Sequence, residues 1–284
     1  MTINKNTKFL IVGLGLLGGS YARGLTEKGY YVEAITKDEK DIEFALRHEI
    51  IKKGTTDIDE EMIRNADIII FALYPRTFVE WIEAYGELIK PGTIITDVTG
   101  VKGCVVEKIQ SMLPPLVEFI SAHPMAGREV FGIENSDESI FYGANYIVVS
   151  TKRNTDEGIE ACKRIGEILG FGRISELSPE AHDEMIGFVS QLTHCIAVSL
   201  MNCYEHGHLE RYTGDSFRDL TRIAKINENM WSELFLMNKE PLLRQMDLFM
   251  GEFNKLRDSL IDDDREDMMN MMRISTERRK MFDK

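Results

Sequence analysis

A glycine-rich turn between an apolar run and a helical stretch limits most strongly what this chain can fold into. Residues 13–18 read Gly-Leu-Gly-Leu-Leu-Gly directly after the apolar run 8–12. The first glycine of such a turn permits a tight bend, the second lets the backbone approach a pyrophosphate, and the third allows close packing of helix on sheet. The N–H groups at the helix start attract phosphate. The turn predicts a dinucleotide site that includes Gly13, Leu14, Gly15, Leu16, Leu17 and Gly18; the alternative is an ordinary glycine-rich turn.

Apolar runs and helical stretches alternate over the first 177 residues. The apolar runs are nearly continuous, as expected of strands buried on both faces of a sheet, and lie at 8–12, 30–36, 67–73, 93–98, 116–122 and 145–150. Helical stretches at 38–48, 76–88 and 102–112 separate several of these runs. The alternation predicts an α/β domain over residues 1–177, built as a doubly wound parallel sheet of the Rossmann type.

The chain changes character at Ser178. This serine and Pro179 are typical of a helix cap and of the first helical position. Further on, one apolar seam recurs at spacings of three and four residues and consists of Leu242, Met246, Phe249, Phe253, Leu256 and Leu260. We expect an all-helical domain over residues 178–284 that completes its core in a homodimer.

Composition excludes several classes of protein. The chain has 34 Lys and Arg against 47 Asp and Glu, a net charge of −13, which disfavours nucleic-acid binding. No apolar run approaches the roughly 20 residues that cross a bilayer, and the N-terminus has no signal-peptide pattern. The four cysteines lack metal-ligand spacing. We expect a cytoplasmic protein with reduced thiols, no metal site and no membrane partner.

The residues after the second apolar run bear on the choice of dinucleotide. An acidic residue there would hold the ribose of NAD, but the chain has Thr36 and Lys37, and a hydroxyl with a cation suits the 2′-phosphate of NADP. The alternative is that Lys37 is solvated and Asp38 serves the ribose of NAD. We expect NADP, with NAD as the alternative, and further cofactor contacts from Leu73, Tyr74 and Thr99.

One histidine stands where an α/β sheet places its ligand. His123 follows the run 116–122 and precedes a proline, and ligands bind at the carboxyl ends of such strands. A single histidine is more often a hydrogen-bonded structural residue. Its position near the expected nicotinamide favours a general base instead.

Several motifs in order along the chain resemble one family, the prephenate and arogenate dehydrogenases of tyrosine biosynthesis. They are GLGLLGGS at 13–20, TDVTGVK at 96–102, HPMAGRE at 123–129, SPEAHD at 178–183, SQLTH at 190–194 and FRDLTRIA at 217–224, followed by Met230 and Trp231. The resemblance covers essentially the whole chain and implies the fold and the dimer described above. It also implies an oxidative decarboxylation in which hydride passes to nicotinamide and carbon dioxide leaves an aromatic phenol.

The resemblance implies a role for particular residues. His123 matches the catalytic histidine, which accepts the proton of the ring hydroxyl. Arg222 matches the arginine that binds a substrate carboxylate. The other implied substrate-site residues are His194 and Gln191 on one helix, Glu129 as a gate, and Trp231, which closes the pocket from the partner subunit.

Two departures from the family pattern bear on the substrate. Gly100 stands where a serine usually lies beside the catalytic histidine, and the adjacent Thr99 is our candidate for the missing hydroxyl. Gln191 stands where many members carry histidine. Nearby, Lys102 is expected to anchor its loop or to steer an anionic substrate, His182 to be structural, and Asp183 to be structural or to touch the substrate.

The sequence thus predicts a dehydrogenase that converts prephenate to 4-hydroxyphenylpyruvate. Arogenate dehydrogenase or a dual-specificity cyclohexadienyl dehydrogenase is the alternative within this chemistry. A dinucleotide-sensing protein without activity is the alternative outside it. A related hydroxyacid or imine reductase is disfavoured because residues 181–205 contain no lysine. No regulatory ACT domain is expected after the helical domain, so feedback by tyrosine would act at the active site.

Overall fold

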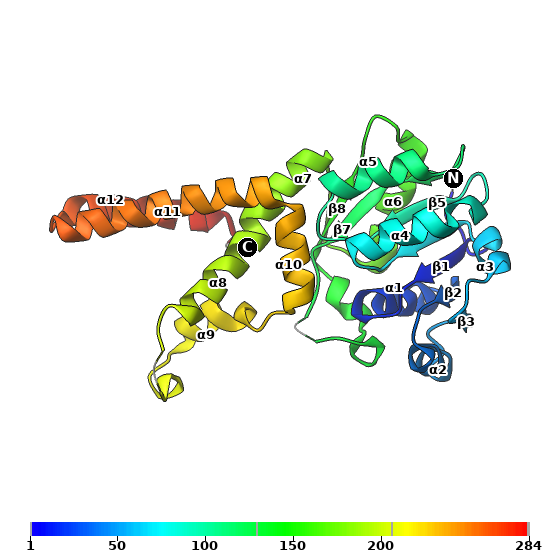
Figure 1. Cartoon of the computed structure of the whole chain (residues 1–284), viewed down its shortest axis with the longest axis horizontal. Coiled ribbons are helices and arrows are strands. Elements are labelled where there is room, and N and C mark those ends of the chain that lie inside the picture. Colours follow the sequence, from blue (N-terminus) through cyan, green and yellow to red (C-terminus); the bar gives the residue numbers. More distant parts are fainter. Residues whose placement is uncertain (1, 129, 206, 283–284) are drawn as a thin grey trace.

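The computed structural model describes residues 2–128, 130–205 and 207–282 and confirms an α/β domain followed by helices (Figure 1). The first sheet has six parallel strands in the order β3-β2-β1-β4-β5-β6. These are β1 (Lys8–Val12), β2 (Tyr31–Ile35), β3 (Lys53–Thr55), β4 (Ile68–Phe71), β5 (Ile94–Asp97) and β6 (Glu118–Phe119). The order reverses between β1 and β4, which is where an open α/β sheet binds its ligand.

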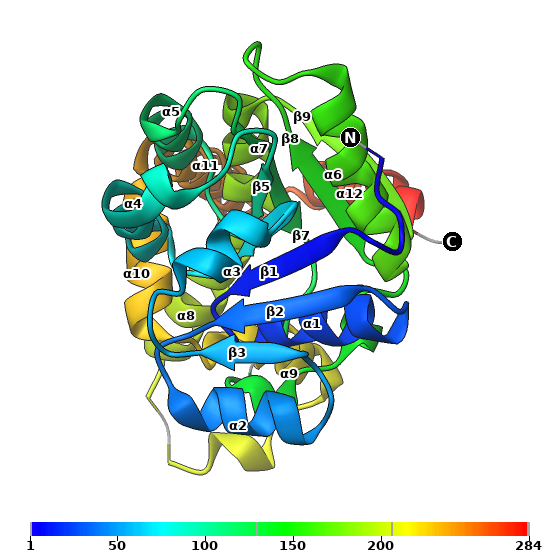
Figure 2. The same ribbon diagram turned by 90° about the vertical axis from the view of Figure 1, so that its right-hand side faces the viewer.

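Helices cover both faces of this sheet, as Figure 2 shows. Two separate apolar cores lie between helices and sheet. The helices over one face are α1 (Leu16–Glu27), α2 (Glu39–Arg47) and α6 (Asp156–Leu169); those over the other are α3 (Glu60–Asn65), α4 (Pro75–Tyr85) and α5 (Gly103–Met112). Burial on both faces explains why the strand sequences are continuous apolar runs.

A second sheet follows from the break of the predicted strand 116–122 into two. Ile120 still bonds to β5 through its N–H and the carbonyl of Ile95 at 2.9 Å. Ser121 and the N–H of Ala122 instead bond to the side chain of Asp97, so the chain leaves the first sheet there. The new strand β7 (Ser121–Pro124) pairs antiparallel with β8 (Asn145–Val149), which pairs parallel with β9 (Arg173–Leu177). The six-stranded sheet is parallel, as predicted. The end of the predicted strand 116–122 instead forms the antiparallel β7 of the second sheet, and β3 and β9 were not predicted.

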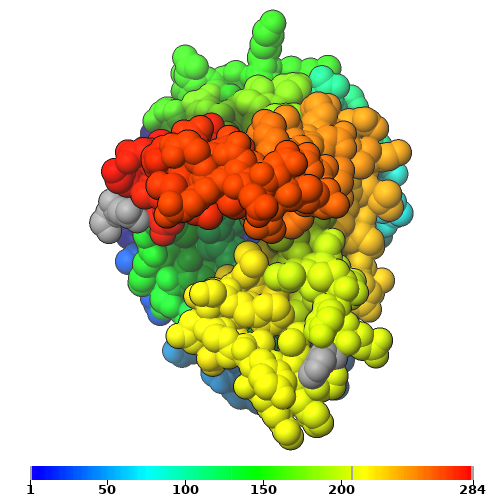
Figure 3. All heavy atoms as spheres, turned by 90° about the vertical axis from the view of Figure 1, so that its left-hand side faces the viewer, coloured from blue at the N-terminus to red at the C-terminus, as the bar shows by residue number. Residues whose placement is uncertain are grey.

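The C-terminal part is helical in the residues that the structure describes. Ser178 caps the first helix by accepting the N–H of Ala181 at 3.2 Å, as predicted. The helices are α7 (Pro179–Ile186), a π-helical turn (Gly187–Leu192), α8 (Thr193–Asn202), α9 (Asp215–Thr221), α10 (Glu228–Met237), α11 (Lys239–Ile261) and α12 (Arg265–Arg279). α11 and α12 form an antiparallel arm that extends away from the α/β domain (Figure 1). Figure 3 shows its outer end, orange to red, above the yellow segment that includes α9.

The run from Pro179 to Asn202 is one continuous helical path. By length and composition alone it could cross a membrane, with a mean hydropathy of 1.3 over its most apolar window, although the sequence has no apolar run of that length. Core helices pass the same test. This run packs against α11 and against α5, and its buried His182 and Gln191 bond to other elements. These contacts make it the connection between the two domains.

Candidate active site at the carboxyl ends of the strands

The glycine turn lies between β1 and α1 as predicted. Gly13 has a φ of +95°, which favours glycine. A Cβ atom on Gly18 would lie 1.9 Å from the carbonyl oxygen of Gly13, whereas a Cβ on Gly15 would meet nothing within 4 Å. Gly18 is thus required by the packing of the protein itself, while Gly15 leaves open space beside the uncapped start of α1. This open, anion-attracting cradle fits a dinucleotide pyrophosphate.

The residues predicted for the ribose and adenine lie around this turn. Leu14 donates its N–H to the hydroxyl of Thr36 at 3.4 Å, and Lys37 and Asp38 follow β2 as exposed residues. Leu73 reaches the turn as well, since a Cβ on Gly13 would lie 2.9 Å from its methyl group. Tyr74 precedes α4 and is 48% exposed.

A fully buried ion pair holds the loop after β5. The ammonium of Lys102 donates to both carboxylate oxygens of Asp97, at 2.9 and 3.1 Å, and to the carbonyl of Ala122 at 2.7 Å. Both side chains are 0% exposed. Burial lowers the pKa of Lys102, and the carboxylate of Asp97 opposes that change. Of the two roles expected for Lys102, the structure therefore supports the anchoring of the loop. The buried ammonium does not face a substrate.

Thr99 belongs to the same cluster and not to the histidine. Its hydroxyl contacts the carboxylate of Asp97 and lies 3.0 Å from the carbonyl of Val101 and 3.2 Å from the ammonium of Lys102. The prediction that Thr99 supplies the missing hydroxyl beside His123 is therefore wrong. Thr99 is 3% exposed, and its hydroxyl helps to hold the loop.

Gly100 is the loop residue that faces the histidine. A Cβ atom there would lie 3.9 Å from Cε1 of His123 and 3.5 Å from the methyl groups of Leu234. These are ordinary contacts, so a serine side chain would fit beside the ring. Gly100 thus leaves room beside the ring but supplies no hydroxyl.

His123 lies on β7 and bonds to a second histidine. Nδ1 of His123 is 2.9 Å from Nε2 of His182 on α7, and Nδ1 of His182 is 2.8 Å from a carboxylate oxygen of Asp183. Asp183 also accepts the N–H groups of Lys102 and Gly103 at 2.9 and 2.7 Å. Sequence reasoning treated His182 only as structural. The signal that could have found it is the adjacent His-Asp pair at the start of the helix that joins the domains.

The surroundings of His123 keep its imidazole neutral. Burial lowers its pKa well below the ordinary value of 6.5, and the nearby His182 and Lys102 lower it further. Burial also lowers the pKa of His182, against the effect of Asp183. Two neutral imidazoles, ordered by one carboxylate, therefore lie at the end of β7, and a neutral imidazole can accept a proton.

The predicted substrate-side residues come from α8, α10 and the turn before α10. His194 stacks on Trp231 of the same chain with ring centroids 3.7 Å apart. The closure of the pocket by the Trp231 of a partner subunit stays a prediction. Arg222 begins a short turn (Arg222–Ala224) that packs against α8, the helix of His194. These three residues are thus gathered around one helix.

Gln191 is placed differently from the prediction. It is 1% exposed, its amide nitrogen donates to the carbonyl of Leu234 at 3.2 Å, and its oxygen accepts from Asn238 at 2.7 Å. Both ends of the amide are therefore used in joining helices rather than in contacting a substrate. Glu129, the predicted gate, lies outside the described residues.

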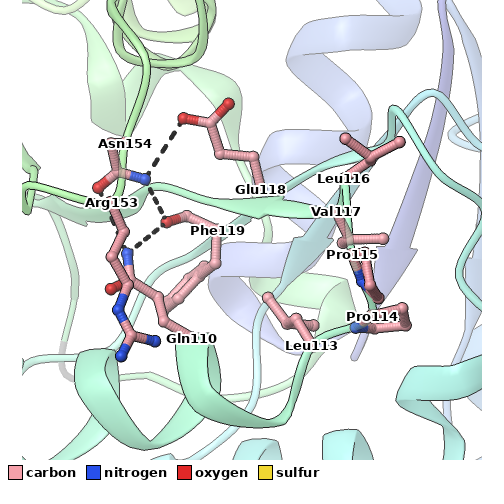
Figure 4. Close-up of a pocket in the computed structure, with 10 residues that line it drawn as sticks. All are labelled: Gln110, Leu113, Pro114, Pro115, Leu116, Val117, Glu118, Phe119, Arg153 and Asn154. Atoms are coloured by element: carbon pink, nitrogen blue, oxygen red, sulfur yellow. Dashed lines mark hydrogen bonds between the residues drawn. The ribbon is translucent and has the colours of Figure 1, made fainter.

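A separate pocket of about 240 Å³ lies at the opposite edge of the sheet, where β6 begins (Figure 4). Its polar groups bond to one another: Gln110 and Asn154 both donate to the carbonyl of Phe119. Its lining includes none of the predicted site residues, so it is separate from the candidate active site. The described part of the chain contains no group of three His, Cys, Asp or Glu side chains that could hold a metal.

Comparison of this chain with known protein families shows to which family it belongs. The nucleotide-binding domain of prephenate dehydrogenase matches residues 21–173, and the dimerization domain of prephenate dehydrogenase matches residues 178–274. The chain belongs to the prephenate dehydrogenase family. This agrees with the resemblance drawn from the motifs and favours an enzyme over a dinucleotide sensor.

Individual relatives support the same assignment. The chain is 28% identical to a prephenate dehydrogenase of Bacillus subtilis, over 95% of this chain and 74% of that protein. It is also 28% identical to a cyclohexadienyl dehydrogenase of Zymomonas mobilis, over 98% and 96% of the two chains. Among solved structures, a prephenate dehydrogenase from A. aeolicus in complex with hydroxyphenyl propionate and NAD+ superposes with a TM-score of 0.90 at 28% identity, over 99% and 100% of the chains.

The two glycines of the turn allow a matched test of the cofactor cradle. We expect Gly15→Ala to unfold at the wild-type temperature but to bind dinucleotide about tenfold more weakly, because the added methyl group occupies only the cradle. Gly18→Ala should melt at a lower temperature even without cofactor, because its methyl group would overlap a backbone oxygen. Thermal melting and a fluorescence titration measure both effects. Wild-type affinity in Gly15→Ala would contradict the assignment.

Breaking the buried ion pair between Lys102 and Asp97 should cause a large loss of stability. Lys102→Met should lower the free energy of unfolding by about 3–5 kcal/mol, because it leaves the carboxylate of Asp97 buried without its partner. The matched control is Lys90→Met, which removes the partly exposed ion pair with Asp67 and should cost less than about 1 kcal/mol. Urea unfolding measures both values, and equal losses would contradict the account.

Proposed function

We propose that this chain converts prephenate to 4-hydroxyphenylpyruvate, with His123 as the general base. The observation that carries the proposal is a neutral imidazole held at the carboxyl end of β7, beside the loop that follows β5 and in the domain that carries the glycine turn. Membership of the family supports the reaction class, and the pKa of His123 supports the role of this residue.

The reaction requires one proton acceptor at the ring hydroxyl of the substrate. When bound, the oxidised nicotinamide supplies the acceptor for the hydride that leaves the hydroxyl-bearing carbon. His123 takes the hydroxyl proton as the carbon–oxygen bond gains double-bond character. The ring carboxylate then leaves as carbon dioxide, its bonding electrons make the ring an aromatic phenolate, and the imidazolium returns the proton to the phenolate oxygen to give the phenol. A neutral imidazole is suited to this step because its unprotonated nitrogen can accept the proton and so become an imidazolium.

The carboxylates of the substrate need cationic or hydrogen-bonding partners. A guanidinium supplies two parallel donors and fixes orientation as well as charge, which supports Arg222 in this role. His194 is held by Trp231 and by the carbonyl of Ser190, 2.9 Å from its Nδ1, and we propose that its imidazole binds the substrate side chain. Arogenate, with an amino group in place of the keto group, is the second candidate substrate, since a cyclohexadienyl dehydrogenase is among the relatives.

The cofactor preference is a finer part of the proposal. Thr36 and the exposed Lys37 favour NADP, because a hydroxyl and a cation suit a 2′-phosphate. The A. aeolicus relative was solved with NAD+, and Asp38 would serve the ribose in that case. We propose NADP as the preferred cofactor and NAD as the alternative.

A homodimer through the arm is the proposed assembly. The dimerization domain of the family covers this region, and Leu248, Phe253 and Leu260 of α11 are each at least 60% exposed in the single chain. Apolar surface of this extent is typical of an interface.

Light scattering tests this assembly. The wild-type chain should show twice its 32.5 kDa mass, and Phe253→Asp should shift it toward the monomer, because a carboxylate would be buried at the interface. A matched control, Glu252→Asp, adds no new charge to α11 and should stay dimeric. A wild-type monomer at micromolar concentration would contradict the assembly.

The proposed function is tested by absorbance of the reduced cofactor, with prephenate or arogenate and NAD+ or NADP+ in turn. Prephenate with NADP+ should give the highest kcat/KM.

The role of His123 is tested by substitution. His123→Asn should lower kcat by a factor of about 100 or more and leave cofactor affinity unchanged. Because the pKa of His123 lies well below 6.5, kcat/KM should stay constant down to that pH and fall only as the imidazole takes up a proton at lower pH. Unchanged turnover in His123→Asn would contradict the assignment of His123 as the general base.

A further inference from the structure

We propose that His182 and Asp183 are positioning residues that fix the tautomer and the orientation of His123, so that its Nε2 is the unprotonated nitrogen offered to the substrate. This inference rests on the proposed function of His123 as the base. It assigns a role to two residues that sequence reasoning had left as structural or undecided.

The tautomers follow from the hydrogen bonds in order. The carboxylate of Asp183 can only accept, so Nδ1 of His182 carries the proton in their 2.8 Å bond. Because His182 is neutral, its Nε2 then has no proton and can only accept. Nδ1 of His123 must therefore donate in the 2.9 Å bond between the two rings. This leaves Nε2 of His123 with a lone pair, and no hydrogen bond joins that atom to any residue in the described ranges.

The chain of bonds has a rigid base. Asp183 is held by the N–H groups of Lys102 and Gly103 at the start of α5, and its carbonyl accepts from the buried Asn238 at 2.9 Å. His182 is 0% exposed. Since Lys102 is itself fixed by Asp97, the ring of His123 is positioned from both domains at once.

This arrangement also accounts for Gly100. A serine at this position would bring a hydroxyl to the side of the ring at Cε1, and the family pattern usually has that hydroxyl. In this chain His182 holds the ring from its Nδ1 side instead. The orientation of the base thus does not depend on a loop hydroxyl.

The first experiment measures the tautomer directly, without turnover. Long-range proton–nitrogen spectra of the ¹⁵N-histidine-labelled chain at neutral pH, with His123 assigned by comparison with His123→Asn, should show His123 protonated at Nδ1. In His182→Phe the ring loses its acceptor, and its signals should move toward an exchange between both tautomers. A wild-type His123 protonated at Nε2 would overturn the inference.

The second experiment separates positioning from stability. His182→Phe should lower kcat with prephenate by about 10- to 100-fold with KM changed by less than about twofold, because the base is misdirected and not removed. His182→Gln places an amide oxygen near the position of Nε2 and should stay within about fivefold of wild type. His48→Phe, at an exposed histidine beyond α2, is the matched control and should leave kcat unchanged.

The outcomes distinguish the inference from the function on which it rests. Equal losses in His182→Phe and His182→Gln would mean a purely structural role and would contradict positioning. A wild-type chain that shows the expected tautomer but no turnover would contradict the proposed function, while the placement of the proton by His182 would stand.

Discussion

The ion pair between Lys102 and Asp97 is the interaction on which the rest of the site depends. Two opposite charges buried at 0% exposure are stable only if every hydrogen-bonding group around them is satisfied. Here the carboxylate accepts from the chain that leaves the first sheet at Ser121, and the ammonium donates to Ala122, the residue before His123. The ion pair therefore determines where β7 starts and where its histidine lies.

The same charge also determines the chemistry of the histidine. A buried ammonium close to an imidazole disfavours a second positive charge, so His123 stays neutral at a pH where an exposed histidine would begin to take up protons. Asp183 does not neutralise this effect at His123, because His182 lies between them. A base that is neutral and oriented suits a reaction in which proton loss accompanies hydride loss.

Much of the fold could be predicted from the sequence, because local patterns decide it. The glycine turn, the buried strands and the capping serine at 178 each depend on neighbours in the chain. The antiparallel strand β7 could not be predicted, because a distant carboxylate, Asp97, redirects it. The site residues follow the same division: His123 and the glycines follow from motifs, and the wrong role of Thr99 arose because a loop can turn a hydroxyl in either direction.

The phase of the connecting helix places Asp183 and His194 against different neighbours. Asp183 and His194 are eleven residues apart, which corresponds to three turns of an α-helix. A π-helical turn at 187–192 intervenes, and π-helical turns have more residues per turn. Asp183 consequently bonds to α5 while His194 stacks on Trp231. Neither the π-helical turn nor the contact between His182 and His123 leaves a periodic signal in the sequence.

A crystal structure of this chain with an oxidised dinucleotide and hydroxyphenyl propionate would test the central claim most directly. The account predicts that the phenol oxygen lies within about 2.6–3.2 Å of Nε2 of His123, while Nδ1 stays bonded to His182. A phenol oxygen bound by another side chain, with His123 turned away from it, would contradict the account.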